Sequence, residues 1–303
     1  MNKTAGWING FLGVLIFSGS LPATRLAVID IDPTFLTMAR ASIAGLLGMV
    51  FLLLFREPFP RKSDAVSLVV VALGVVVGFP LLTGLALQHM TSAHAIVFIG
   101  LLPLSTAIFA VLRGGERPRP LFWLFSVVGS LVVASYAYGQ GSQSTLMGDG
   151  LMLAAIIVCG LGYAEGARLS RRLGGWQVIC WALVFALPVM LPLSVFTRPE
   201  TWNGIGAMAW GGLAYVSLFS MLIGFVFWYR GLAQGGTATV GQLQLLQSFF
   251  RADAGGRRGR GTGQHGHGSN GGRGCCLRGG CEEIRLEHFR AKTVSHFCWK
   301  CSK

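Results

Sequence analysis

Eight apolar runs of about 20 residues constrain this chain more than any other feature of its sequence. A helix rises about 1.5 Å per residue, so runs of this length cross a hydrocarbon core of about 30 Å. Hydrophobic residues make up 52% of the chain and charged residues 12%, whereas soluble domains carry about 25% charged residues. We therefore predict an all-α polytopic membrane protein. The runs lie at 7–28, 33–55, 65–87, 91–112, 120–138, 147–168, 177–197 and 207–229.

The basic residues of the loops predict the orientation of these spans. If the spans alternate in direction, eleven Lys and Arg residues fall on one side and only Arg198 falls on the other. Cytoplasmic loops carry such an excess of positive charge. We expect the inner (plasma) membrane, a cytoplasmic N-terminus and a first span that is not cleaved as a signal peptide.

Two stretches of the sequence recur at almost the same distance. Residues 18–25 align with 161–168, an offset of 143, and residues 91–93 align with 236–238, an offset of 145. The repeating unit is then five helices, and an odd number of helices places the second copy upside down in the membrane. Secondary transporters use such inverted repeats around a site near the midplane. We predict a first repeat at 1–138 and a second, incomplete repeat at 147–250.

The segment LLPLSTAIFAVLRGGERP, residues 101–118, carries a resemblance to a known family. Together with the five-helix repeat and the short loops, it resembles the EamA family of the drug/metabolite transporter superfamily over residues 5–250. In that family the fourth helix of each half carries a proline in its middle and ends in a Gly-Glu pair, as Pro103 and Gly115-Glu116 do here. The resemblance implies a secondary transporter that exports or imports a small metabolite or drug-like solute by alternating access.

The second repeat departs from this pattern near its end. Its ninth span starts at Thr237 and reaches only Phe250, about 21 Å of helix, and no tenth span follows. The tail, residues 251–303, is rich in Gly, Arg and Cys and holds 11 Lys/Arg against 4 Asp/Glu. Charged residues cost about 2.5–3.5 kcal/mol each at the centre of a membrane helix. We predict a disordered tail, with helix nine truncated and helix ten missing.

A shifted reading frame explains the composition of the tail. Opposite residues 251–258 the neighbouring frame can encode Ala-Leu-Thr-Leu-Ala-Ala-Val-Val, which would complete the ninth helix. The same frame allows a Gly-Glu pair opposite Arg260 and Gly261, which lie 145 residues after Gly115 and Glu116. We expect a frameshift at this point and impaired transport by the chain that carries this tail.

The alternative function treats the helices as an anchor and the tail as a cytoplasmic binding module. The stretch GGRRGRG is typical of RNA-binding segments, and a basic tail attracts anionic lipid. Thiolates and an imidazole of the tail are the groups that zinc prefers. We nevertheless expect no nucleic acid partner, no metal and no cofactor. The zinc candidates of this alternative are Cys275, Cys276, Cys281, His296, Cys298 and Cys301.

Arg40 and Glu165 are the strongest candidates for substrate binding or coupling, because ionisable groups inside membrane spans are costly and often functional. Arg40 lies in the second span. Its guanidinium could be a counter-charge for an anionic or zwitterionic substrate or a partner for Glu165. The alternative is a side chain that extends to the outer interface of the membrane. One hypothesis is that Glu165 takes up a proton during transport, since desolvation raises the pKa of a carboxyl group. The other is that it forms a local ion pair with Arg168.

Further polar side chains lie in corresponding spans of the two repeats. His94 begins the fourth span, and Gln242, Gln244 and Gln247 follow the start of the ninth. Glutamines hydrogen-bond a polar solute or a neighbouring helix. Their spacing of two and five residues puts them on different faces of a helix, so all three cannot line one pocket.

Small residues and proline complete the predicted set. Pro103 marks a helix bend, and Gly162 and Gly166 form a GxxxG spacing that permits close helix contact. The body of the chain has no phosphate loop and no pairing of a nucleophile with a base, so we expect no enzyme. The expected partners are a small-molecule substrate and the lipid bilayer, and we leave a homodimer open.

Overall fold

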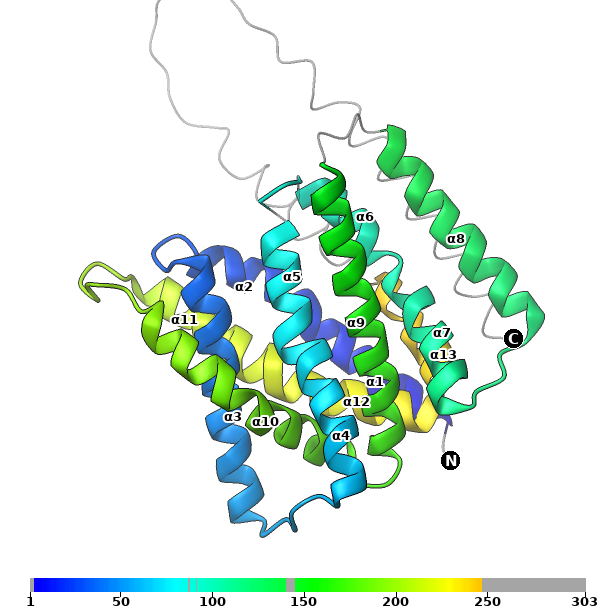
Figure 1. Ribbon diagram of the computed structural model, residues 1–303, viewed down its shortest axis with the longest axis horizontal. Helices are drawn as coiled ribbons and strands as arrows, with labels where there is room; N and C mark the ends of the chain where they lie inside the picture. The colour runs from blue at the N-terminus through cyan, green and yellow to red at the C-terminus, as the bar shows by residue number, and fades with distance from the viewer. Residues whose placement is uncertain (1–2, 87, 91, 140–144, 247–303) are drawn as a thin grey trace, which may run out of the picture.

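The computed structural model describes residues 3–86, 88–90, 92–139 and 145–246, and the regular secondary structure of these residues is all helical (Figure 1). Six helices are long and apolar enough to cross a membrane, and two shorter apolar helices accompany them. This confirms the predicted class of protein. The helices are α1 (Lys3–Ser18), α2 (Ser20–Ala27), α3 (Pro33–Leu54), α4 (Lys62–Val71), α5 (Phe79–Ala86), α6 (Ser92–Ile99), α7 (Leu102–Gly114), α8 (Pro120–Gly139), α9 (Leu146–Ser170), α10 (Gly175–Phe196), α11 (Ala207–Tyr215), α12 (Gly224–Gly235) and α13 (Thr237–Gly241).

The predicted single span at 91–112 is wrong, because the structure divides it into α6 and α7. The two helices are separated by a turn at residues 100–101. Pro103 follows as the second residue of α7. A proline lacks the N–H of an interior helical residue, and its ring collides with the carbonyl four residues earlier. Pro103 therefore lies at a helix start and not at a bend within a continuous span.

A break also interrupts the first predicted span, between α1 and α2. The hydroxyl of Tyr215 donates a hydrogen bond to the Ile16 carbonyl at 3.0 Å, in place of a helical N–H. A Cβ atom at Gly19 would lie 2.3 Å from that hydroxyl, so only glycine leaves room for it. A side chain from α11 thus fits into the opening between the two helices.

Two π-helical segments occupy matching positions in the two halves. The segment η1 (Ala72–Gly78) joins α4 to α5, and η2 (Val216–Ile223) joins α11 to α12. The N–H of Phe79 bonds to the Gly74 carbonyl, and the N–H of Gly224 bonds to the Phe219 carbonyl. These two bonds lie 145 residues apart, which is the distance found between residues 91–93 and 236–238.

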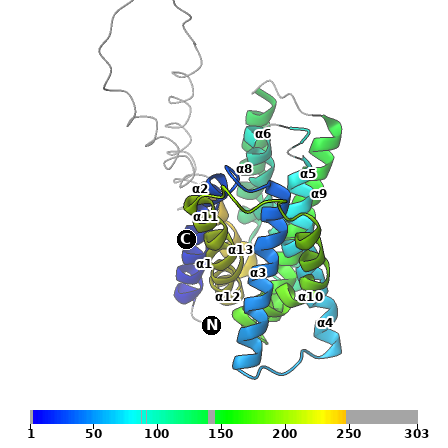
Figure 2. The ribbon, with the colours of Figure 1, turned by 90° about the vertical axis from the view of Figure 1, so that its left-hand side faces the viewer.

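Glycines bring α1 and α12 into close contact. A Cβ atom at Gly6 would lie 2.4 Å from the Gly235 nitrogen, and one at Gly231 would lie 2.5 Å from the Gly10 nitrogen. On the other side of the bundle, α9 packs along α4, η1 and α5, while α3 packs along α10 (Figure 2). Helices from the first half therefore pair mainly with helices from the second.

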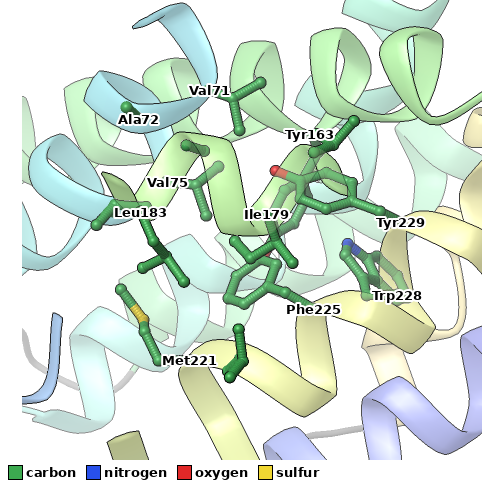
Figure 3. Packing of buried hydrophobic residues seen from close by; sticks show 14 of the residues in the cluster. Val71, Ala72, Val75, Tyr163, Ile179, Leu183, Met221, Phe225, Trp228 and Tyr229 are labelled. Atoms are coloured by element: carbon green, nitrogen blue, oxygen red, sulfur yellow. The ribbon is translucent and has the colours of Figure 1, made fainter. Parts of the chain in front are cut away.

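The main core lies where these pairs meet (Figure 3). Ile179 and Leu183 of α10 face Val75 of η1, and Phe225 and Trp228 of α12 lie in the same cluster. In contrast, α8 stands at the edge of the bundle (Figure 1). Among the described residues, its main contacts are with α6 and α7.

The ninth predicted span is described only over its first part. Helix α13 ends at Gly241, a turn follows at residues 242–243, and a helical turn resumes at 244–246. Gln247, the remainder of the span to Phe250 and the tail at 251–303 lie outside the described residues, as do the zinc candidates and the predicted frameshift.

Candidate functional site

Four arginines and three acidic residues gather at one end of the bundle, which we call the arginine end. It comprises the ends of α7 and α9 and the starts of α4 and α13, and it corresponds to the predicted cytoplasmic side. Its members come from spans of both halves. They are Asp64, Arg113, Glu116, Glu165, Arg168, Arg171 and Arg172.

Glu165 is the most deeply buried of these, with none of its side chain exposed. Its carboxylate pairs with the guanidinium groups of Arg113 from α7 and, at 2.9 Å, Arg168 from its own helix. The local pair with Arg168 is one of the two alternatives weighed from the sequence. The partner Arg113 lies 52 residues away along the chain, and the salt bridges of Glu165 are not made with Arg40.

Glu116 connects α7 to the start of α13. Its carboxylate accepts hydrogen bonds from the N–H groups of Thr237 at 2.8 Å and Ala238 at 3.0 Å, and it pairs with Arg171, the residue directly after α9. The macrodipole of a helix favours a negative charge at its N-terminus. One carboxylate therefore holds three helices together at the arginine end.

A third pair joins α4 to α9 at the same end. Asp64 is buried and pairs with Arg172, and Ser67 accepts a hydrogen bond from Arg168 at 2.9 Å. The ion pairs of the arginine end thus connect the predicted third, fourth, sixth and ninth spans.

Arg40 lies seven residues into α3, about 10 Å from the end of that helix opposite the arginine end. Its Nε is buried and has no hydrogen-bond partner among the described residues. Buried donors are almost always satisfied. Among the described residues, the Arg40 Nε therefore has an unused donor inside the bundle.

A cluster of aromatic and amide groups surrounds Tyr163 in α9, two residues before Glu165. The centre of the Tyr163 ring lies 5.7 Å from that of Trp228 (Figure 3). The Gln244 side chain lies near the Tyr163 hydroxyl. Trp228 Nε1, a donor, and Gln244 Oε1, an acceptor, are buried without partners among the described residues. Gln244 was predicted from the sequence, whereas Trp228 and Tyr163 were not, because a buried aromatic ring is typical of any core.

The remaining predicted residues fall in separate places. His94 of α6 bonds to Asp149 of α9 at 2.9 Å, at the end opposite the arginine end. Gln242 lies in the turn after α13 with its buried Nε2 unpaired among the described residues. The glycines have different neighbours, since a Cβ at Gly162 would meet Val75 at 2.6 Å and one at Gly166 would meet Tyr229 at 2.1 Å.

Apolar spans, ion pairs at one end and buried polar groups between the halves define a polytopic helical membrane protein. The chain belongs to the EamA-like transporter family, which it matches over residues 4–136 and 146–252. It is a membrane transporter. The resemblance stated from the sequence is thereby confirmed.

Relatives of the chain agree with this family. The chain is 72% identical over 251 residues to "Uncharacterized transporter YdeK" of Bacillus subtilis (strain 168), covering 82% of this chain and 88% of that one. It is 24% identical over 234 residues to a "Probable terminal-alkyne amino-acid exporter" of Streptantibioticus cattleyicolor, covering 74% and 75%. A crystal structure at 19% identity has the same fold, with a TM-score of 0.68 and coverage of 84% and 91%.

Proposed function

We propose that the chain moves a small solute across the inner membrane by alternating access between two inverted five-helix repeats, with the N-terminus in the cytoplasm. The observation that carries this proposal is the pair of π-helical segments, one in each half, at the 145-residue offset of the sequence repeat. Such segments are rare and often lie at functional sites. Their occurrence at equivalent positions supports two halves with the same architecture.

The helix pairing supports the same proposal. If the halves are related by a two-fold axis in the membrane, the contact of the first span with the eighth has a counterpart in the contact of the sixth with the third. The packing of α1 on α12 and of α9 on α4, η1 and α5 has this relation. Alternating access would then rock one set of paired helices against the other around a central site.

The solute we propose carries a carboxylate or another small anionic group, bound by Arg40. The guanidinium fork suits bidentate binding of a carboxylate, and Arg40 has an unpaired Nε in the described part of the chain. A relative bears the name of an amino-acid exporter. Trp228 and Gln244 would provide a donor and an acceptor for the solute deeper in the bundle.

Transport in reconstituted vesicles tests this proposal. A chain whose frame is restored after residue 250 is compared with the chain as it stands, using radiolabelled amino acids and small carboxylates. We expect uptake by the restored chain and a large loss with the present tail. Arg40→Ala and Glu165→Gln should abolish uptake while the protein still inserts, and Arg40→Lys should restore only part of it. Equal uptake by Arg40→Ala and the unmodified restored chain would remove Arg40 from the site.

A further inference from the structure

The contacts of Glu116 suggest a role that goes beyond joining two helices. Gly115 ends α7 with φ +63°, a left-handed conformation that glycine adopts without strain. The N–H groups of Gly115 and Glu116 both bond to the Ala110 carbonyl. The chain therefore turns back sharply after α7 and directs the Glu116 carboxylate toward α13.

The start of α13, which Glu116 contacts, also depends on a glycine. Gly236 precedes α13 with φ +94°, and directly after it the N–H groups of Thr237 and Ala238 point at the two carboxylate oxygens. Thr237 is buried, and Arg171 reaches both Glu116 and the Thr237 hydroxyl, the latter at 3.5 Å. Two glycine turns thus bring one carboxylate and two backbone donors together between the halves.

We propose that Glu116 is the latch of the cytoplasmic gate: its carboxylate holds the start of the ninth span against the fourth and sixth spans, and release of this contact opens the arginine end. The inference rests on the proposed alternating access. Glu116 acts as a positioning residue, since its contacts are with the chain and not with the solute.

Three features make the contact suitable for a reversible latch. It connects the two halves through a single side chain. Its hydrogen bonds are charge-assisted, which makes them strong but dependent on one carboxylate. Glu116 is mostly but not fully buried, at 17% exposure, so water can replace its partners when the contact opens.

Native cysteines provide the reporters for a test. Cys159 of α9 adjoins Gly160, which packs against Ser105 of α7, whereas Cys180 of α10 lies against Gly48 of α3, in an interface that Glu116 does not join. Both are buried. Opening of the arginine end should expose Cys159 alone, whereas unfolding should expose both thiols.

The experiment measures alkylation of the full chain by N-ethylmaleimide in membrane vesicles, with each cysteine resolved by peptide mass spectrometry. We expect Glu116→Gln to raise the alkylation rate of Cys159 about tenfold, the effect of losing one charge-assisted hydrogen bond on an opening equilibrium. Arg171→Gln should act in the same direction and Glu116→Asp more weakly. The control Glu200→Gln, at an exposed residue between α10 and α11, should change neither rate.

The possible failures are distinguishable. An equal rise at Cys159 and Cys180 in Glu116→Gln would mean that the residue only stabilises the fold, and would overturn the latch. If Cys159 reacts faster than Cys180 in the unmodified chain but is unaffected by Glu116→Gln, the latch fails and alternating access stands. If both thiols stay equally protected in every variant, alternating access itself is contradicted, and the latch with it.

Discussion

The two ends of the bundle are held together by different interactions. At the arginine end, three carboxylates pair with four guanidinium groups from several spans. At the opposite end, within the described residues, His94 pairs with Asp149, and the Gly206 N–H bonds to Asp30 at 2.9 Å. The described residues therefore form one strongly ion-paired end and one weakly joined end.

The sequence gives a reason for this asymmetry. The first half ends its fourth span with Gly115-Glu116, and Glu116 supplies a latch at the arginine end. The corresponding positions of the second half are Arg260 and Gly261. In the predicted repeat register, the sequence therefore has no carboxylate at the position that would correspond to Glu116.

The largest effect on this contrast is expected from Glu165→Leu. Removing one partner of a buried ion pair costs about 3–5 kcal/mol, and we expect the lower value because Arg113 and Arg168 are 51% and 44% exposed and can regain water. The free energy of unfolding, measured by denaturant titration in detergent micelles, should fall by about 3 kcal/mol. A loss no larger than that of Asp149→Asn would show that the two ends are equally strong.

A middle-sized effect is expected where the π segments lie between the two ends. A Cβ at Gly78 would lie 2.4 Å from the Leu73 carbonyl, and one at Gly224 would lie 2.7 Å from the Phe17 ring. Gly78→Ala and Gly224→Ala should each lower the free energy of unfolding by about 2 kcal/mol through overpacking.

Each of these variants has a control in the same span. Gly84 of α5 and Gly211 of α11 have no atom within 4 Å of an added Cβ, so Gly84→Ala and Gly211→Ala should change the same free energy by less than about 0.5 kcal/mol. If the four variants behave alike in the titration, the close approach at the π segments has no energetic importance.

The smallest effect is expected at the opposite end from Asp149→Asn. Its pair with His94 is partly exposed, and exposed pairs contribute about 0–1 kcal/mol. Thermal unfolding in the same detergent should therefore shift little. A destabilisation that approaches that of Glu165→Leu would contradict the contrast between the ends.

Much of the fold could be predicted from the sequence, because long apolar runs can only be membrane helices. The internal breaks could not. The Tyr215 hydroxyl that bonds to α1 beside its break comes from α11, far away in the sequence. The π-helical turns leave no mark in the hydrophobic periodicity. Only Pro103 gave a local sign of its break, which was interpreted as a bend.

The candidate site shows the same division between local and distant information. The pair of Glu165 and Arg168 follows from their spacing in one helix, whereas Arg113 joins them from another span. Glu116 stood out in the sequence only as part of a family pattern. Its contact with α13 depends on two turns that meet in three dimensions, so its physical role required the structure.

The close approach of α1 to α12 has a consequence for biogenesis. Gly6 and Gly10 fit against Gly235 and Gly231, so the earliest helix to leave the ribosome finds its partner only after more than two hundred further residues have been synthesised. Until then its glycine face has lipid or the insertion machinery as its only neighbour. Folding of the two halves is therefore tied to completion of the eighth span, and a chain interrupted before that point should be a target for membrane proteases.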